Sequence, residues 1–239
     1  LDDPSNAVDR LSIQLLGDDR PGPAHDFKFV NSTALTLFKL STRGFYSEGS
    51  VDIDVGSNAL VVDGLVELRT PGGLKVRAGD VTTRQEMRVT GGIDFSQVSG
   101  DIDIQDRIFV GDADFVVGNG QAKIIVQAGV EVADGYHFKA YGTHFEFAKG
   151  LGDIGTGYYD TLRTIGGNID LRGITGEVWI EENVDTGGGD FLSAGTHLTI
   201  GAYGDVLSLE TISTSGGKVD VSGHTGTFTM MFAHQIDTG

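Results

Sequence analysis

Apolar and polar residues alternate over most of the chain, in short runs separated by glycine, asparagine and aspartate turns. Such runs occupy residues 51–55, 74–77, 101–104 and 122–126. Alternation with a period of two places one side of a strand on a core and the other side in water. No helical pattern fills the gaps between these runs, so the sequence predicts an all-β protein.

A short phrase recurs along the chain: an apolar residue, any residue, threonine, any residue and two glycines. It stands at residues 162–167, 184–189 and 212–217, again at 68–73, and in a weaker form at 87–92. Successive glycine pairs, where they can be followed, lie about 19 to about 28 residues apart. A period in this range is typical of solenoids and of arrays of supersecondary units.

The connections between repeats decide which fold is expected. Parallel strands need a return connection of a dozen or more residues, and a return made of strands and glycine turns gives a parallel β-helix, or β-solenoid. In that fold the phrase occupies an equivalent corner of each coil, so Gly72, Gly166, Gly188 and Gly216 are expected to form one stack along the axis. The same spacing also fits antiparallel strands, which leaves an antiparallel β-sandwich as the alternative.

The pattern divides the chain into unequal parts. Residues 1–26 are predicted to be an irregular N-terminal segment or cap, although residues 11–15 alternate as a strand would, which we favour over a helix there. Residues 27–239 are predicted to form the solenoid, with an aromatic-rich insertion or atypical coil at about 131–161. Residues 236–239 match the first positions of a further phrase, so we expect a fragment of a longer repetitive chain.

Composition narrows the possible functions. The 239 residues include 37 glycines and four prolines, yet 39% are hydrophobic, which is too apolar and too evenly spread for disorder. The absence of cysteine excludes disulfides and thiolate metal sites. The formal charge of −17 would repel a phosphate backbone, so no nucleic-acid partner is expected. No run approaches the roughly 20 apolar residues of a membrane span.

Three aspartate doublets are the candidate metal ligands. They are Asp52 with Asp54, Asp101 with Asp103, and Asp112 with Asp114. Alternation puts both members of a doublet on the water-facing side of a strand, and stacked coils would bring aspartates of adjacent coils side by side at about 4.8 Å. Calcium prefers such carboxylates and is the cofactor that this pattern suggests. The alternative is a solvated acidic wall that binds no specific ion.

The aromatic-rich stretch supplies the candidate ligand-binding residues. Tyr136, Tyr141, Tyr158 and Tyr159 gather in or near it. Aromatic rings offer broad apolar faces to sugar rings, and tyrosine adds a hydrogen-bonding hydroxyl, so these residues form a candidate glycan-binding surface. The alternative is a hydrophobic segment that packs on the solenoid.

Sequence motifs predict no catalytic residues. The chain has no Gly-x-Ser-x-Gly elbow, no phosphate-binding loop and no His-Glu-x-x-His segment. Pairs of carboxylates could in principle serve a glycosidase. A carbohydrate-active β-helix enzyme, either a polysaccharide lyase or a glycoside hydrolase, is therefore the alternative to a non-enzymatic protein.

Residues 212–224 and 184–195 resemble the repeats of filamentous haemagglutinin-type and other giant bacterial surface proteins. The resemblance covers mainly residues 162–239 and is weaker at residues 68–92. It implies a right-handed parallel β-helix shaft, secretion to the cell surface, and adhesion or filament formation in place of catalysis. The Asn-Pro-Asn-Gly motifs of that family's secretion domain are missing, and no site residues are carried over.

These observations together predict a non-enzymatic structural or adhesive segment of a secreted or cell-surface bacterial protein, acting as a shaft, an adhesin or a filament subunit. The expected partners are following repeats or other copies of the chain, joined end to end, and surface glycans.

Overall fold

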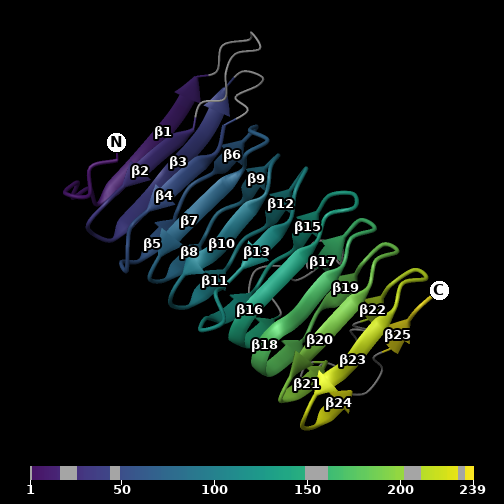
Figure 1. Cartoon of the computed structure of the whole chain (residues 1–239). Coiled ribbons are helices and arrows are strands. Elements are labelled where there is room, and N and C mark those ends of the chain that lie inside the picture. Colours follow the sequence, from purple (N-terminus) through teal and green to yellow (C-terminus); the bar gives the residue numbers. More distant parts are fainter. Residues whose placement is uncertain (1, 17–25, 44–48, 149–160, 202–210, 231–234) are drawn as a thin grey trace.

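The computed structural model describes residues 2–16, 26–43, 49–148, 161–201, 211–230 and 235–239. These residues form 25 strands and no helix, and every strand pairing is parallel. The chain winds as a β-solenoid of about 8 turns, from β1 at one end to β25 at the other (Figure 1). The predicted parallel β-helix is confirmed, and the antiparallel sandwich is excluded. Among the described residues, no helix is long and apolar enough to cross a membrane.

Each turn contributes strands to three faces, which we call A, B and C in the order in which the chain visits them. Face A consists of β2 (Phe27–Val30), β4 (Val51–Asp54), β7 (Leu74–Ala78), β10 (Ile93–Val98), β13 (Phe115–Val117), the first parts of β16 (Phe138–Phe147) and β18 (Ile169–Ile180), β20 (Phe191–Gly195) and β23 (Val219–His224).

Face B begins with the first residues of β1 (Arg10–Leu16) and the first part of β3 (Leu35–Arg43). It continues through β5 (Leu60–Val62), β8 (Val81–Thr83), β11 (Ile102–Ile104), β14 (Lys123–Val126), the second parts of β16 and β18, β21 (His197–Ile200) and β24 (Phe228–Met230).

Face C takes the remainder of β1 and β3. It continues through β6 (Val66–Leu68), β9 (Met87–Val89), β12 (Ile108–Val110), β15 (Val130–Val132), β17 (Thr161–Thr164), β19 (Asn183–Asp185), β22 (Thr211–Ser213) and β25 (Gln235–Asp237).

The core is built from inward columns, in which one residue of each coil lies over the equivalent residue of the previous coil. The first inward column of face A runs through Phe27, Val51, Leu74, Ile93, Phe115, Phe138, Ile169, Phe191 and Val219. From Val51 to Phe191 these side chains are at most 2% exposed. The alternation of apolar and polar residues in the sequence therefore predicts correctly which side chains enter the core.

Phenylalanines fill the middle of the core. The rings of Phe95, Phe115 and Phe138 follow one another edge to face, with centroid distances of 5.8 and 5.4 Å. Phe145 and Phe147, on the same strand as Phe138, are also fully buried. These three aromatics of the stretch at 131–161 thus line the core, since β15 and β16 pair with both neighbouring coils. The register shifts twice between β16 and β18, and residues 149–160 lie outside the described part.

The repeated phrase forms the corner between face C and face A. The buried hydroxyl of Thr164 donates a hydrogen bond to the carbonyl oxygen of Gly167 at 2.6 Å. Thr214 and Gly217 make the same contact at 2.7 Å, and Thr186 makes it with the second glycine of its own phrase. The threonine side chain therefore closes the turn three residues further on, which explains the spacing of the phrase.

The four glycines expected to stack lie at this one corner of their coils. Gly166, Gly188 and Gly216 each have a positive φ, between 76° and 114°, which glycine adopts without strain. Gly72 precedes β7 at the same corner, where Thr70 donates a hydrogen bond to the carbonyl of Gly49 in the previous coil at 2.6 Å. The expected stack is confirmed for the copies at 162–167, 184–189 and 212–217, whose first residues share one column. It is wrong for Gly72, because Leu68 lies in the column of Thr164 and the copy at 68–73 is therefore shifted in register.

The solenoid begins earlier than the boundary expected at residue 27. Residues Arg10–Leu16 form β1, which pairs with β3 along its whole length. Leu11, Ile13 and Leu15 are partly buried against the core. The strand that we favoured for residues 11–15 is confirmed, because alternate residues of β1 belong to the inward columns.

Candidate functional site

The outer face of the solenoid carries charged columns that run along the axis. On face A the column between the two inward ones consists of Lys28, Asp52, Lys75, Asp94, Val116, Lys139, Asp170, Leu192 and Asp220. Basic and acidic residues alternate over its first four coils. Opposite charges on directly paired strands stabilise each other, so this column offsets part of the charge repulsion that the composition suggests.

The predicted aspartate stacking is wrong for the first doublet. Asp52 lies between Lys28 and Lys75, and its carboxylate is 3.7 Å from the Lys28 ammonium. Asp54 pairs with Arg77, and the Asp54 carboxylate and the Arg77 guanidinium are also 3.7 Å apart. Alternation placed both aspartates on the outer face correctly, but the register brings cations beside them.

The second doublet lies on face B. Asp101 stands between Asp80 and Lys123 of the neighbouring coils, so here two aspartates are adjacent. The backbone N–H of Asp101 donates to the Asp80 carboxylate at 2.8 Å. Asp103 accepts hydrogen bonds from the side-chain amides of Gln105 at 2.6 Å and Gln127 at 2.8 Å. Protein donors therefore occupy both oxygens of the Asp103 carboxylate.

The third doublet lies where face C passes into face A. The Asp114 carboxylate accepts hydrogen bonds from the Lys139 ammonium at 2.5 Å and from the backbone N–H of His137 at 2.9 Å. Burial alone would raise the pKa of Asp114, but these two donors outweigh it and lower the pKa. Asp112 sits in the turn, where its backbone N–H donates to the carbonyl of Thr90.

The six aspartates therefore lie on three different parts of the surface. Among the described residues, no group of three or more histidine, aspartate or glutamate side chains is arranged to hold a metal ion. Calcium binding by these residues stays a prediction.

Polar side chains also form a ladder at the start of face A, which the sequence reasoning did not predict. The backbone N–H of His137 donates a hydrogen bond to the Asp114 carboxylate, and the backbone N–H of Asn168 donates to Nδ1 of His137. In the next two coils, the backbone N–H of Asp190 donates to the side-chain oxygen of Asn168, and the backbone N–H of Lys218 donates to the Asp190 carboxylate. The four distances are 2.8 or 2.9 Å. Each residue immediately precedes the inward column of face A. A short polar acceptor at this one position of successive repeats is the sequence signal that identifies such a ladder.

His137 gives a direct test of this ladder. Because Nδ1 of His137 accepts a hydrogen bond, the proton of the neutral ring lies on Nε2. An asparagine at position 137 would place its side-chain oxygen at a similar distance from the backbone, as Asn168 does in the next coil. We expect His137→Asn to leave the free energy of unfolding nearly unchanged. His137→Leu should lower it by about 1–2 kcal/mol, because the N–H of Asn168 loses its acceptor. Urea unfolding curves measure both; equal losses in the two variants would contradict the ladder's role.

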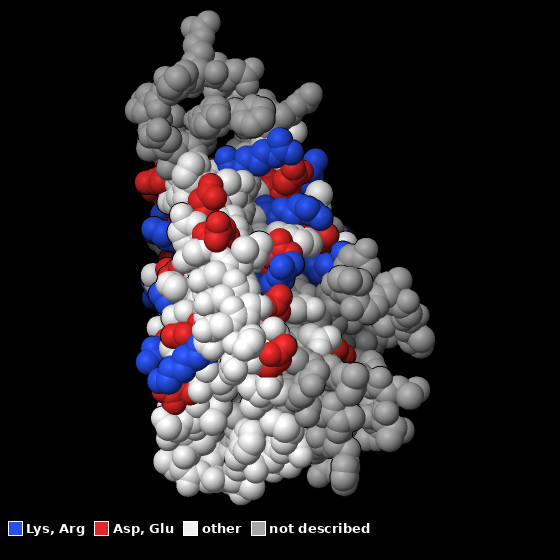
Figure 2. Space-filling model, turned by 90° about the vertical axis from the view of Figure 1, so that its right-hand side faces the viewer, with Lys and Arg blue, Asp and Glu red and all other residues white. Residues whose placement is uncertain are grey.

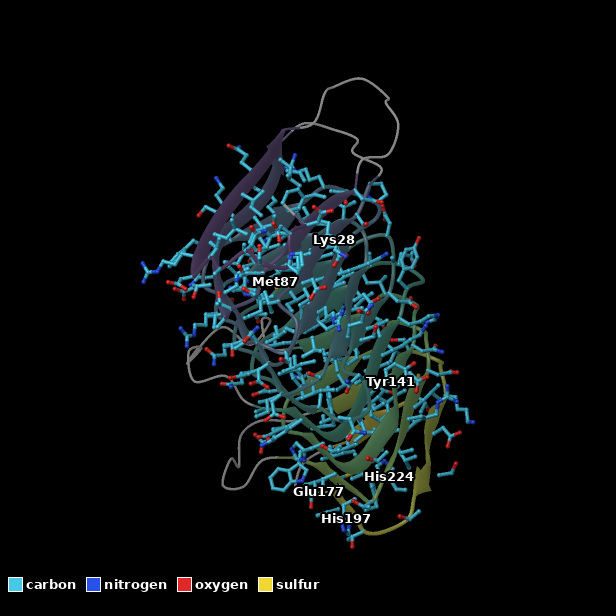
Figure 3. The ribbon with its side chains drawn as sticks, turned by 60° about the vertical axis from the view of Figure 1, so that its left-hand side comes forward. Lys28, Met87, Tyr141, Glu177, His197 and His224 are labelled. Atoms are coloured by element: carbon cyan, nitrogen blue, oxygen red, sulfur yellow. The ribbon has the colours of Figure 1, made fainter. Side chains whose placement is uncertain are left out.

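The predicted tyrosines do not gather into one surface within the described residues. Tyr141, labelled in Figure 3, is 41% exposed near the end of face A. Tyr136 lies at the opposite end of face A, partly buried against the core, about 16 Å away along an extended strand. Tyr158 and Tyr159 lie outside the described residues. The glycan surface formed by these tyrosines stays a prediction.

A groove of about 420 Å³ runs along face C across β6, β9, β12 and β15. Its lining includes Thr90, Gly111 and Ala133, small residues at equivalent places of successive coils. The outer column of Glu67, Arg88, Phe109 and Glu131 also lines the groove. Acidic and basic side chains are interspersed on the part of the surface that faces the viewer in Figure 2.

Cation–π and ion-pair contacts order the side chains that line the groove. The Arg88 guanidinium lies 4.4 Å from the centre of the Phe109 ring, and Arg88 also pairs with Glu86. Its hydrogen bond to Glu86 raises the pKa of Arg88. Arg69 pairs with Glu67 at 2.7 Å. The groove thus offers fixed donors, fixed acceptors and an aromatic edge to an elongated ligand that lies along the axis.

The groove carboxylates do not have the spacing of a glycosidase pair. Glu67 and Glu131 belong to the same column, three coils apart, which corresponds to about 14 Å. Paired glycosidase carboxylates lie about 5–9.5 Å apart. These two glutamates therefore cannot act together on one glycosidic bond.

A serine and a histidine are in contact near the last coil. Ser193 Oγ lies 2.9 Å from His224 Nε2, as in a nucleophile and its base. However, Ser193 is only 1% exposed, and Nδ1 of His224 has no hydrogen-bond partner in the described structure. Burial, together with the charge of His197, lowers the pKa of His224. A hydroxyl enclosed in this way has no access to a substrate, so the contact is structural.

The last described coil leaves inward columns open. Phe228 and Met230 of β24 continue the columns of Leu198 and Ile200, which are at most 1% exposed. Phe228 is 48% exposed and Met230 is 38% exposed. Side chains that point along the core direction are thus accessible at the end of the solenoid, where no described strand pairs beyond β23, β24 and β25.

No protein-family model, curated protein or solved structure matches this chain. The resemblance to haemagglutinin-type repeats therefore stays a hypothesis.

Proposed function

We propose that this chain is a non-enzymatic structural and adhesive segment of a secreted or cell-surface bacterial protein. The observation that supports this proposal most strongly is the set of inward columns that continue through successive coils. Such a fold extends by adding coils, because each coil contacts only its neighbours. It supplies length and stiffness, which are the properties of a shaft.

The outer surface supports the same proposal. The faces along the shaft carry ion pairs such as Lys28 with Asp52 and Arg163 with Asp185. Together with the net charge of −17, charged sides disfavour lateral association of parallel shafts.

The groove on face C is a candidate surface for adhesion. Three glutamates, Glu67, Glu86 and Glu131, surround Arg88, so an acidic ligand would meet repulsion. A neutral glycan is a better chemical match, since its hydroxyls can both donate to the glutamates and accept from the arginines. The edge of Phe109 adds apolar contact beside them.

A panel of soluble polysaccharides tests this function. We expect saturable binding of a neutral glycan, without new reducing ends or unsaturated products on prolonged incubation. Phe109→Ala should weaken that binding about fivefold or more, in line with the roughly 1 kcal/mol of one aromatic contact. Tyr141→Ala is the matched control at an exposed aromatic residue outside the groove.

Two outcomes of this test would contradict the proposal. Turnover that persists through purification would favour the alternative, a carbohydrate-active β-helix enzyme, for which the groove's mixture of carboxylates and guanidinium groups is the supporting observation. Weakening by Tyr141→Ala with no effect of Phe109→Ala would move the adhesive site to the predicted tyrosine surface.

A further inference from the structure

The outer column of face A has an order of charges that is complementary to its own reverse. Along the described strands this column reads Lys28, Asp52, Lys75, Asp94, Val116, Lys139, Asp170, Leu192 and Asp220, with Val116 in the middle. Counted outwards from Val116, each charged residue has a counterpart of opposite charge at the same distance on the other side, except Asp52, whose counterpart is Leu192. Such a column can face an inverted copy of itself without bringing like charges together.

We propose that face A is a homodimer interface, in which a second copy of this chain packs antiparallel about a two-fold axis that passes through Val116 and lies parallel to the strands. In this arrangement Val116 meets Val116 of the second copy. Asp94 meets Lys139 of the second copy, and Lys75 meets its Asp170. The same surface is used by both copies, so the contact closes at two chains.

The charge order specifies the register of this dimer. Strands of both copies are about 4.8 Å apart, so opposed residues stay in step along the column. Figure 1 shows the strands of face A side by side along the shaft. A slip by one coil would place Lys75 against Lys139 in one direction and Asp94 against Asp170 in the other, and like charges disfavour both.

The charge order also specifies the orientation. Two parallel copies that met through this column would place every residue against itself, so each lysine would face a lysine and each aspartate an aspartate. This arrangement is disfavoured by like-charge repulsion in every charged coil. Only the antiparallel copy presents the opposite charges.

Side chains of the column are available for the contact. Among the described residues, no hydrogen bond or ion pair engages the Lys75 ammonium, although Lys75 stands between Asp52 and Asp94. The Lys28 ammonium is 3.7 Å from the Asp52 carboxylate, and the Lys28 side chain is 50% exposed. Val116 is half-buried on the outer side of β13. These groups can meet a second copy without breaking a close contact within the chain.

An exposed aromatic residue lies close to the proposed axis. Tyr141 follows Lys139 by two residues on β16, one coil from Val116, and is 41% exposed. The arrangement brings the Tyr141 ring within one coil of Gly118 of the second copy, which has no side chain to exclude it. Aromatic residues are enriched in protein interfaces, so the dimer gives this exposed ring a partner.

One like-charge pair accompanies the antiparallel register. Arg77 and Arg172 belong to the second outer column of face A and face each other across the axis. Each is paired with an aspartate of its own chain, Arg77 with Asp54 at 3.7 Å and Arg172 with Asp170 at 2.7 Å. Their charges are therefore balanced locally, and the opposite-charge contacts of the first column outnumber this pair.

The size of the face predicts a weak dimer. The column is about 38 Å long, and strands of three to five residues make the face about 10–17 Å wide. The contact then covers about 400–600 Å² of each copy, or about 1,000 Å² in total, which is the lower end of specific interfaces. The groove on face C stays exposed in this dimer. An antiparallel contact joins shafts that approach from opposite directions, and this role in adhesion rests on the proposed function.

A single cysteine on the axis tests the arrangement, because the chain contains no cysteine of its own. Val116→Cys should form a disulfide-linked dimer, and no larger species, on a non-reducing gel. Ile125→Cys is the matched control, since Ile125 is a half-buried aliphatic residue on the outer side of face B. It should cross-link at least about tenfold less, because its two copies do not come within disulfide distance.

Lys75→Cys distinguishes the two orientations. In the antiparallel register the two cysteines lie four coils apart, about 19 Å, which is too far for a disulfide. In a parallel dimer they would lie opposite each other. Cross-linking of Lys75→Cys as complete as that of Val116→Cys would overturn the antiparallel register.

Charges placed on the axis test the contact without cross-linking. Position 116 lies between Asp94 and Lys139, so the monomer tolerates either sign there. Val116→Lys and Val116→Glu should each raise the concentration for half association about tenfold or more in sedimentation velocity, because like charges then meet on the axis. An equimolar mixture of the two variants should restore the dimer. Ile125→Lys changes the net charge as Val116→Lys does and should leave association unchanged.

The outcomes separate this interface from the proposed function. A wild type that stays monomeric at every concentration, or a mixture of the two charged variants that does not associate, would overturn the interface. Val116→Lys should still bind the neutral glycan as tightly per chain as the wild type, because Val116 lies outside the groove. Dimerisation of a wild type that binds no glycan would support the interface and count against the adhesive groove.

Discussion

Replacing Phe115 with alanine is expected to lower the free energy of unfolding by about 3–5 kcal/mol. Phe115 is fully buried and lies between Phe95 and Phe138, with ring centroids 5.8 and 5.4 Å away. Its removal leaves a cavity and deletes two edge-to-face contacts in one step. Guanidinium unfolding followed by far-ultraviolet circular dichroism measures the loss as a lower midpoint.

Phe109→Ala is the matched control for this substitution. Phe109 lies on the outer face of the next strand back and loses a contact with Arg88 worth about 0.5–1 kcal/mol. Because each coil contacts only its neighbours, hydrogen exchange in Phe115→Ala should rise most in the coils of Phe95 and Phe138. A loss for Phe115→Ala no larger than that for Phe109→Ala would contradict the phenylalanine stack.

Gly189→Ala is expected to cost about 3 kcal/mol or more. A methyl group at this position would lie 1.9 Å from the carbonyl oxygen of Gly167, one coil below. The obstacle is backbone, so no side-chain rotation relieves it, and the same corner is repeated at Gly217. The measurement is the midpoint of chemical unfolding, combined with the yield of soluble protein.

Gly135→Ala separates crowding from backbone strain. Gly135 has a φ of 78°, but a methyl group there would meet nothing within 4 Å. We expect a cost of about 1–2 kcal/mol, which is the strain of a left-handed conformation alone. If Gly135→Ala proved as costly as Gly189→Ala, close approach of the coils could not be the reason for the paired glycines.

The sequence by itself determined the strands, the side of each strand that enters the core and the position of the corners. Alternation identifies inward residues such as Ile53 and Val76 because every coil buries one side of each strand. The threonine and glycine phrase identifies the corner because a buried hydroxyl closes it and a side chain at the second glycine would collide with the previous coil. These requirements are local, so the sequence of a single repeat is enough to recognise the strands and the corner.

Only the tertiary structure decided which outer residues meet. The coils differ in length: Leu74 pairs with Ile93, whereas Phe138 pairs with Ile169 much further along the chain. A bulge in β10 shifts the register once more between Asp94 and Gln97. Neighbours across coils therefore cannot be counted from a fixed period.

For this reason the charged columns and the groove could not be predicted from the sequence. Asp52 was placed on the correct face but meets lysines, and Phe109 drew no attention because its partner Arg88 belongs to another coil. An outer residue has no packing requirement that fixes its neighbour in advance. The pairing of inward columns sets the register, and the outer contacts follow from it.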